Sequence, residues 1–262
     1  MKKTTLSFIF FILLTFNVNA QRWGVPNLRE YDFDNVHFGF LLGMNQMGFC
    51  VKQNFDQLYD IAPTLSPKAE TGLPVDSYLT SVIPSSASGF TIGVTSSFKI
   101  TDNFYFRFTP ALVLGSGRSI NYSLVDIGGK SLVDANGKSL SQIKTLNSTL
   151  IELPLILRFQ GSRIQNTEPF VQAGLKYTYN FSGTEENPSV LTAFPLKLKK
   201  NEIYGVFGLG FNFYFDWFKM GVEGSMNYGF QDILDRSGAN SIYKNGITSL
   251  KSKYFQLSVT FE

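Results

Sequence analysis

The sequence has 262 residues and a formal net charge of +3, and only 16% of its residues are charged while 15% are aromatic. Ordinary soluble domains carry about 25% charged residues, so this chain has too few charges to cover a soluble globule of its length. The weak positive charge gives no reason to expect nucleic acid as a partner. The single cysteine, Cys50, excludes an internal disulfide framework and a multi-cysteine metal site.

Met1–Ala20 has the three parts of a secretory signal. Lysines give a positive start, Leu6–Phe16 forms a short apolar core, and small residues before the end provide a cleavage site. We therefore expect a signal peptide over residues 1–20 and an exported mature chain that begins near Gln21. A periplasmic lead-in over residues 21–35 would precede the folded domain of residues 36–262.

Downstream, apolar and polar residues alternate along eight segments. This period predicts β-strands, because successive side chains of a strand point to opposite faces. In chain order the expected strands are Val36–Phe49, Gly89–Ile100, Phe104–Gly115, Asn147–Phe159, Pro169–Phe181, the two arms of the hairpin Ile203–Phe230, and Lys251–Phe261. They are long enough for the roughly 9–11 residues with which a tilted strand crosses a bilayer.

The connections between these segments alternate between long and short. The long ones are Lys52–Ser88, Ser116–Leu146, Ser182–Asn201 and Gln231–Leu250. Outer-membrane barrels have an even number of strands, short periplasmic turns and long extracellular loops. The sequence therefore predicts an all-β fold, an eight-stranded antiparallel up-and-down transmembrane β-barrel in the outer membrane, with four long extracellular loops and both termini in the periplasm.

The same alternation would also suit a secreted soluble barrel of the lipocalin type, with apolar side chains inside and polar ones in water. Two features favour the membrane. The polar faces are rich in glycine, which suits a narrow lumen better than a solvent face, and the apolar faces carry no charge in nearly every strand. The sheet must then close, because an open edge would leave unpaired backbone groups in hydrocarbon.

An eight-stranded barrel has an interior about wide enough for side chains to fill it. Charged residues on the polar faces that we expect in the lumen are Lys99, Arg107, Glu152, Arg158, Lys176 and Glu223. Unpaired charges in the lumen would be costly. We therefore expect these residues to form a hydrogen-bonded network rather than an ion path, and the strand count excludes a general diffusion porin.

Candidate catalytic residues are sparse. His37, the single histidine, lies at the expected periplasmic start of the first strand, whereas a Ser/His or Cys/His relay needs its base beside a nucleophile. Glu152 and Glu223 could form a carboxylate pair, but nothing beyond their acidity supports it. The stretch Asp134–Gly137 is better explained as a turn than as a calcium loop, because the later ligands are missing. We expect no enzyme, cofactor or metal.

Five lysines gather where the last strands reach the expected extracellular rim. They are Lys197, Lys199, Lys200, Lys251 and Lys253. An ordinary solvated rim explains them, and so does contact with lipopolysaccharide phosphates. Lysine serves as a point-charge partner of phosphate and can reach the interface from a lipid-facing strand end.

The stretch Leu150–Phe159 reads LIELPLILRF and is similar to a strand motif of the Bacteroidetes outer-membrane β-barrel family. Further stretches resemble the PorT-like barrels of the type IX secretion system within that family. These are His37-Phe38-Gly39-Phe40, Gly43-Met44-Asn45, the long second connection, Pro169-Phe170 with Gly174, and the Ala20-Gln21 processing site.

The resemblance implies an accessory or docking role in exporting proteins with C-terminal sorting signals, and in gliding motility where it occurs. Its expected partners are outer-membrane lipid, lipopolysaccharide and other type IX components, and it implies no catalytic residues. Two alternatives remain open. One is a generic small barrel for envelope integrity or adhesion, and the other is an outer-membrane enzyme that modifies lipid or peptide.

Overall fold

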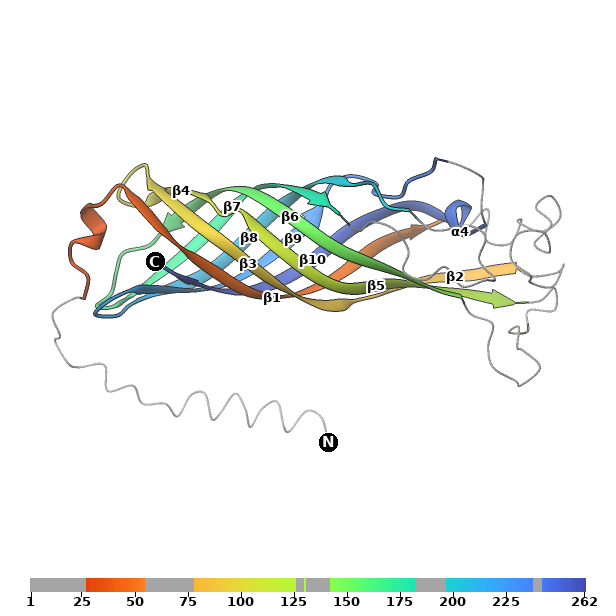
Figure 1. The fold of residues 1–262 in the computed structure, drawn as a ribbon, viewed down its shortest axis with the longest axis horizontal. Coiled ribbons are helices and arrows are strands. Elements are labelled where there is room, and N and C mark those ends of the chain that lie inside the picture. Colours follow the sequence, from red (N-terminus) through yellow and green to blue (C-terminus); the bar gives the residue numbers. More distant parts are fainter. Residues whose placement is uncertain (1–26, 55–77, 126–129, 131–141, 182–196, 238–241) are drawn as a thin grey trace, which may run out of the picture.

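The computed structural model describes residues 27–54, 78–125, 130, 142–181, 197–237 and 242–262 (Figure 1). The predicted signal peptide, the start of the lead-in and the stretch Asp134–Gly137 lie outside these residues. Within them, no helix is long and apolar enough to cross a membrane. The described chain folds into one long, twisted sheet that is rolled into an elongated barrel (Figure 1).

The strands are antiparallel and follow one another around the barrel. Their bounds are β1 Val36–Gln53, β2 Tyr78–Ser85, β3 Ala87–Lys99, β4 Phe104–Phe108, β5 Ala111–Val125, β6 Gln142–Gln160, β7 Thr167–Asn180, β8 Asn201–Tyr214, β9 Lys219–Gly229 and β10 Ile247–Phe261. A 3-10 helix, η1, spans Tyr31–Phe33, and a short helix, α4, spans Ile242–Asn245.

The sheet closes because β1 pairs with β10 on one side and with β3 on the other. β4 and β5 lie end to end between β3 and β6 and together occupy one strand position of the ring. The register against β3 is the same for both, since Phe108 lies opposite Ser96 and Ala111 lies opposite Gly93. β2 pairs with β5 alone. The closed ring of the described residues therefore has eight positions, which confirms the predicted eight-stranded antiparallel barrel.

Several predicted boundaries were wrong. The strand expected over Phe104–Gly115 is interrupted before Ala111, at Pro110, because proline has no N–H to donate to a neighbouring strand. The connection expected over Lys52–Ser88 contains β2, which continues the line of β3 past Ser86 along β5. Several strands also run further than predicted, as β6 does in starting at Gln142.

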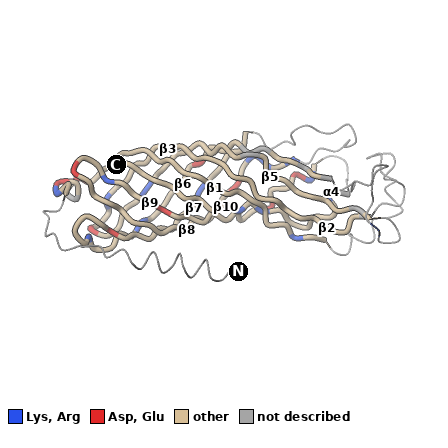
Figure 2. Tube along the Cα trace, turned by 90° about the horizontal axis from the view of Figure 1, so that it is seen from below, with Lys and Arg blue, Asp and Glu red and all other residues tan. Residues whose placement is uncertain are grey.

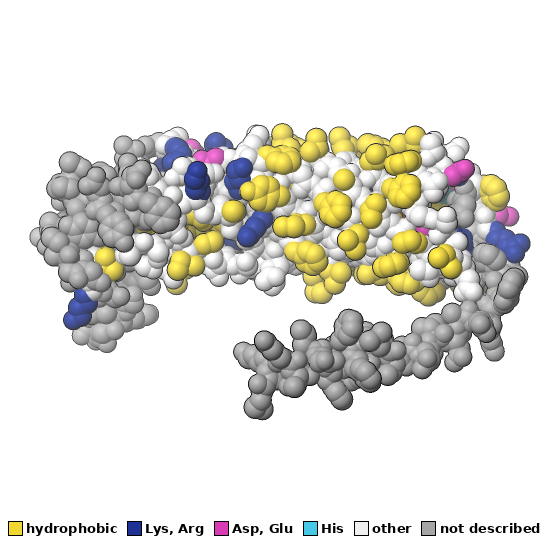
Figure 3. Space-filling model, turned by 180° about the vertical axis from the view of Figure 1, so that it is seen from behind, with side chains coloured by type: hydrophobic (Ala, Val, Ile, Leu, Met, Phe, Trp, Pro, Cys, Tyr) yellow, Lys and Arg dark blue, Asp and Glu magenta, His cyan; other side chains and the backbone are white. Residues whose placement is uncertain are grey.

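Around most of the barrel the apolar side chains face outward. Phe38 and Phe40 are each 67% exposed, whereas the guanidinium-bearing Arg158 is only 2% exposed. On the face seen in Figure 3 the apolar side chains form a broad band across the wall, and we call the part of the wall with outward apolar side chains the belt. Figure 2 shows that basic and acidic positions lie among one another along the barrel. Apolar side chains that face outward and charged side chains that face inward are the arrangement of a membrane barrel, with lipid outside and polar groups inside. A soluble barrel of the lipocalin type would have the opposite arrangement.

The two ends of the barrel differ. At the end that holds η1 and the last residue, Glu262, short turns join the strands (Figure 1). We call it the terminal end. At the other end β1, β2, β5, β6 and β10 continue beyond the belt and enclose a buried apolar cluster. We call this part the distal extension. Its core consists of Phe49, Leu79, Val82, Ile120, Tyr122, Leu146, Leu198, Ile233, Leu234, Ile247 and Leu250.

Within single strands the alternation reverses where the distal extension begins. On β1 the outward side chains are apolar up to Met44, and Gln46 and Lys52 follow on the same face. On β5 a bulge between Gly115 and Arg118 marks the change. Beyond these points most apolar side chains point inward, as in a water-soluble domain, and Ile83 and Ile143 are exposed exceptions. The reversal marks where the wall stops facing hydrocarbon.

Candidate functional site

The lumen of the belt is filled by charged and polar side chains that pair with one another. Arg158 donates from Nε to Gln172 Oε1 at 2.9 Å and from Nη2 to Glu223 Oε2 at 2.9 Å. Gln172 Nε2 donates to Glu223 Oε1 at 2.6 Å, which completes a closed triangle. The guanidinium of Arg158 also lies 3.7 Å from the ring centre of Phe170. Three strands, β6, β7 and β9, supply this cluster from positions that face inward.

A second cluster lies closer to the distal extension. Lys176 Nζ is 2.9 Å from Glu152 Oε2. The hydroxyl of Tyr254 accepts a hydrogen bond from Lys176 Nζ and donates one to Glu152 Oε1. The ring of Tyr204 packs edge-on against that of Tyr254, with centroids 5.5 Å apart. These contacts satisfy a buried ion pair whose members would be costly if left alone.

A third cluster closes the terminal end. The side chain of Glu262 turns into the lumen, where it pairs with Arg107 and lies 3.3 Å from Lys219 Nζ. The hydroxyl of Tyr31 donates to Glu262 Oε2 at 2.6 Å. The ring of Tyr31 stacks on that of His37 with centroids 3.7 Å apart. The lead-in is thus attached across the terminal mouth, and we call the segment of residues 27–34 the cap.

The charges of this cluster set the protonation of the cap. Burial acts to raise the pKa of the Glu262 carboxyl, but Arg107, Lys219 and Arg158 together hold that pKa well below its usual range. Burial, with the nearby Glu262 carboxylate, raises the pKa of the Tyr31 hydroxyl. The tyrosine therefore remains a donor and the carboxylate an acceptor at neutral pH.

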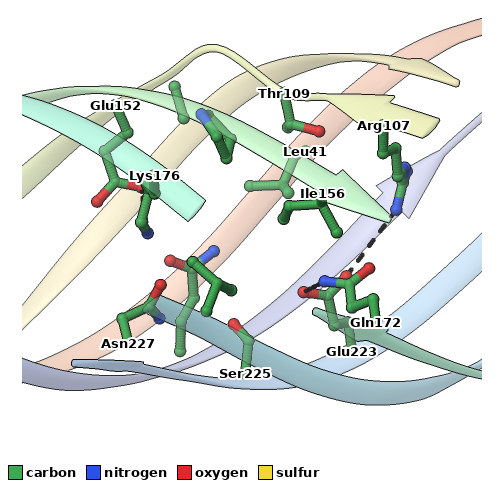
Figure 4. A pocket seen from close by; sticks show the side chains of 14 residues that line it. Leu41, Arg107, Thr109, Glu152, Ile156, Gln172, Lys176, Glu223, Ser225 and Asn227 are labelled. Atoms are coloured by element: carbon green, nitrogen blue, oxygen red, sulfur yellow. Dashed lines mark hydrogen bonds and ion pairs between the residues drawn. The ribbon is translucent and has the colours of Figure 1, made fainter. Parts of the chain in front are cut away.

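A small cavity separates the first two clusters (Figure 4). Its volume is about 40 Å³, and Asn227 and Gln256 are among its lining residues. Both atoms of the Asn227 amide and Oε1 of Gln256 are buried without a protein hydrogen-bond partner. The cavity has room for water molecules bound to these amides, but not for a continuous channel.

The lumen is closed at both ends of the described chain. The cap covers the terminal mouth, and the buried core of the distal extension lies across the other end. Arg118 lies beneath that core, with Nη1 3.1 Å from Ser252 Oγ and its guanidinium 4.2 Å from the ring centre of Phe49. A path for ions would have to cross both the ionic clusters and an apolar layer.

The structure brings most of the predicted lumen residues together. Arg158 and Glu223 lie in the first cluster, Glu152 and Lys176 in the second, and Arg107 bridges towards the third. Arg107 Nη1 is also 3.9 Å from Glu223 Oε2.

Lys99 lies apart from these clusters, at the barrel rim. There its ammonium is 3.0 Å from Asp102 in the turn after β3. The alternation does point this side chain inward, but the strand ends at this residue and the turn supplies the nearer partner.

Sequence reasoning missed several members of the clusters. Lys219 alternates with Glu223 on the inward face, so its position alone could have included it. Glu262 follows the outward Phe261 and therefore also faces inward. The contribution of Tyr31 had no signal in the alternation, because it lies in η1 before the first strand.

The candidate catalytic residues are separated. Glu152 and Glu223 belong to different clusters, on opposite sides of the cavity in Figure 4. His37 is buried and its ring face is covered by Tyr31. Among the described residues, no group of three His, Cys, Asp or Glu side chains is placed to hold a metal ion.

The five predicted rim lysines lie at the distal end of the belt. Lys251 and Lys253 project from the outer face of β10, and Lys251 Nζ lies 5.7 Å from the ring centre of Tyr228. Lys197, Lys199 and Lys200 precede β8 and are exposed, with Lys199 Nζ donating to the carbonyl of Asp232 at 2.9 Å.

One protein family and several solved structures are similar to this chain. The sequence pattern of the family described as outer membrane protein beta-barrel domain matches residues 19–235. No curated protein sequence matches the chain significantly. Among solved structures, Neisserial surface protein A aligns with 9% identity and a TM-score of 0.40, over 87% of this chain and 98% of that one. OprG from Pseudomonas aeruginosa aligns with 14% identity and a TM-score of 0.40, over 85% and 93%. Ail of Yersinia pestis, in complex with the heparin analogue sucrose octasulfate, aligns with 8% identity and a TM-score of 0.37, over 87% and 99%.

Proposed function

This chain belongs to the outer membrane protein beta-barrel domain family and lies in the outer membrane, and we propose that it serves there as a non-enzymatic anchor that presents a rigid docking surface. One observation carries this proposal. The lumen is filled by paired charges and closed at both ends, so the described barrel has no passage to offer a solute. The distal extension, by contrast, has its own buried core and holds its strands beyond the belt.

The simplest test of the anchor role is conductance. The purified protein, reconstituted in planar bilayers, should show no stepwise ion conductance, because ions would have to displace buried ion pairs and cross the apolar core. Its strands should meanwhile give the circular dichroism of a folded barrel. Reproducible channels of a single unit conductance would overturn the proposal.

The more specific role that we propose is that of an accessory or docking component of type IX protein secretion, with gliding motility affected where it occurs. Its support is the resemblance of Leu150–Phe159 and the stretches on β1 and β7 to PorT-like barrels. In this role the working surfaces would be the distal extension with its connecting segments, and the cap in the periplasm. Other secretion components would be the partners.

A deletion strain tests the specific role directly. Proteins with C-terminal sorting signals should accumulate inside the cell, and the wild-type gene should restore their release. A strain that releases every such cargo normally would overturn this role. If that strain instead shows altered permeability or surface binding, the generic role in envelope integrity or adhesion takes its place. Alanine at His37, Glu152 and Glu223 that abolishes a lipid- or peptide-modifying activity would identify an enzyme.

A further inference from the structure

The charged side chains at the distal edge of the belt are concentrated on one side of the barrel. On β1, on β10 and on the segments after β9 and before β8, the exposed or half-exposed cations are Lys52, Lys251, Lys253, Lys197, Lys199, Lys200, Arg236 and Lys244. We call this set the basic rim, and Figure 3 shows basic side chains gathered between the apolar belt and the distal end. Two carboxylates lie nearby. Asp232 pairs with Arg236 at 3.2 Å, and the backbone N–H of Asp235 donates to the carbonyl of Lys197 at 3.0 Å.

The opposite side of the same edge has fewer cations among the described residues. They are Lys130, which is exposed after β5, and Lys144 on β6. At the corresponding level, the outward positions described on β3, β5 and β6 include Ser88, Ser119, Ser123 and Thr149, together with Ile143, which is 61% exposed. The larger number of cations beside β1 and β10 fits a ligand with negative charge that contacts these strands and β9.

A groove lies at this place on the outer wall. Its volume is about 280 Å³, and its lining residues are Gln46, Gly48, Ser86, Met226, Lys253, Tyr254 and Phe255. The strand registers explain its shape. Phe255 lies between Gln46 and Met226, and one step further along, Lys253 lies between Gly48 and Tyr228. The missing side chain at Gly48 leaves a hollow directly beside the lysine.

The groove has two chemical halves. Towards the belt, Met226 and Phe255 are 57% and 54% exposed and face hydrocarbon. Towards the distal extension, Lys253, Gln46 and Ser86 offer a cation and hydrogen-bonding groups. An added Cβ at Gly48 would meet only the side chain and Cα of Ser86 within 4 Å, so the hollow is open on its other sides.

A molecule that fits both halves must carry acyl chains and an anionic headgroup at the same depth as the belt edge. Lysine is a point-charge partner for phosphate, and its stem can lie along apolar surface while the ammonium stays at the interface. The end of an outer-membrane barrel with long connections faces the outer leaflet. Phosphorylated glycolipid is the amphiphile of that leaflet with this chemistry.

We propose that this groove binds a phosphorylated glycolipid of the lipopolysaccharide type. A phosphate lies against Lys253 and Lys251, the sugar edge lies near Gln46 and Ser86, and an acyl chain follows Phe255 and Met226. The proposal rests on the orientation given under the proposed function, but not on the secretion role. The proposal assigns lipopolysaccharide contact to two of the five predicted lysines, Lys251 and Lys253. Lys199, by comparison, already donates a hydrogen bond to the carbonyl of Asp232.

The test measures, by native mass spectrometry, how tightly bisphosphorylated lipid A binds to the purified, detergent-folded full chain. The same lipid without phosphates and phosphatidylglycerol are the comparison ligands. The double variant K251Q/K253Q should lose about tenfold or more in affinity for the phosphorylated lipid, since it removes two charge-assisted contacts to phosphate. K99Q, at the terminal end, is the matched lysine control and should bind like the wild type.

A second variant tests the hollow without changing a charge. Gly48→Leu should fill it and weaken binding by about tenfold, and circular dichroism shows whether the barrel still folds. Three results would overturn the proposal. They are equal affinity for lipid A with and without its phosphates, equal affinity for lipid A and phosphatidylglycerol, and a loss of affinity with K99Q as large as with K251Q/K253Q. Because binding is measured in vitro, a normal secretion phenotype leaves this result unaffected, and the two proposals fail separately.

Discussion

The belt and the distal extension are built from the same strands with opposite chemistry. In the belt, Phe40 faces lipid while Arg158 is buried in the lumen. In the distal extension, Ile120 is fully buried while Lys52 faces outward. The physical cause is the solvent, since hydrocarbon accepts apolar side chains and rejects charges, and water does the reverse.

The comparison teaches where the membrane ends and what holds each part together. The belt depends on paired charges inside, where losing one partner leaves the other buried alone. The distal extension depends on close packing of apolar side chains, like any soluble domain. A destabilising substitution in one region should therefore change the free energy of unfolding by a different amount, and affect a different part of the chain, than one in the other region.

The largest effect is expected from breaking the lumen triangle. Glu223→Ala removes the carboxylate that accepts from both Arg158 and Gln172, and breaking a buried pair costs about 3–5 kcal/mol. Denaturant unfolding of the protein in lipid vesicles, followed by circular dichroism, measures the free energy of unfolding. Glu223→Gln is the control, because it keeps an acceptor oxygen and should lose less. A loss below about 1 kcal/mol for Glu223→Ala would show that the lumen charges do not hold the belt.

The second effect concerns the core of the distal extension. Ile120→Ala creates a cavity at a site that is 0% exposed, and such changes cost about 2–5 kcal/mol. Because the core is separate from the lumen clusters, hydrogen exchange should accelerate in residues 47–53, 118–125 and 247–250 while the belt remains protected. Ser123→Ala, at an outward position on the same strand, should leave exchange unchanged. Equal acceleration in both regions would mean that they unfold as one unit.

The third effect tests the boundary on a single face of β1. Phe40 and Cys50 are both outward, the first in the belt and the second beyond it. Phe40→Arg should destabilise the barrel by about 2–4 kcal/mol, the cost of arginine near the bilayer midplane. Cys50→Arg should stay within about 0.5 kcal/mol of the parent. The measurement is again denaturant unfolding in vesicles, and similar costs at the two sites would place the boundary elsewhere.

The alternation was enough to predict the belt, because lipid outside and a narrow lumen inside impose the same period on every strand. It identified Arg107, Glu152, Arg158, Lys176 and Glu223 as inward positions, and all five are buried. Which charge pairs with which could not be predicted, since that depends on the stagger between β6, β7 and β9.

The distal extension escaped prediction for a different reason. β2 contains Pro84 and several hydroxyl residues, and its buried apolar side chains, Leu79 and Val82, face a core that other strands complete. Read alone, it has the composition of a loop. Its identity as a strand comes from pairing with β5, a contact between segments far apart in sequence that no local pattern encodes.

The smallest effect concerns the terminal end, where polar contacts close the lumen instead of an apolar core. Tyr31→Phe removes the hydroxyl that donates to Glu262 but keeps the ring that stacks on His37. A hydrogen bond to a charged group is worth about 1.5–3 kcal/mol, and only the cap depends on this one. Faster hydrogen exchange in residues 28–35, with an unchanged belt, is the expected result.

Acid should weaken the same contact in the wild type. The pKa of Glu262 is held below its ordinary value of 4.5, so the stabilisation by its carboxylate is complete above that value and is lost as the pH falls below it. Exchange in the cap, corrected for the intrinsic rate at each pH, should rise only below about pH 4.5. If Tyr31→Phe exchanges like the wild type at neutral pH, the hydrogen bond to Glu262 does not hold the cap, and its other contacts do, namely the stacking on His37 and the hydrogen bonds of Asn27 with Asn166 and Tyr214.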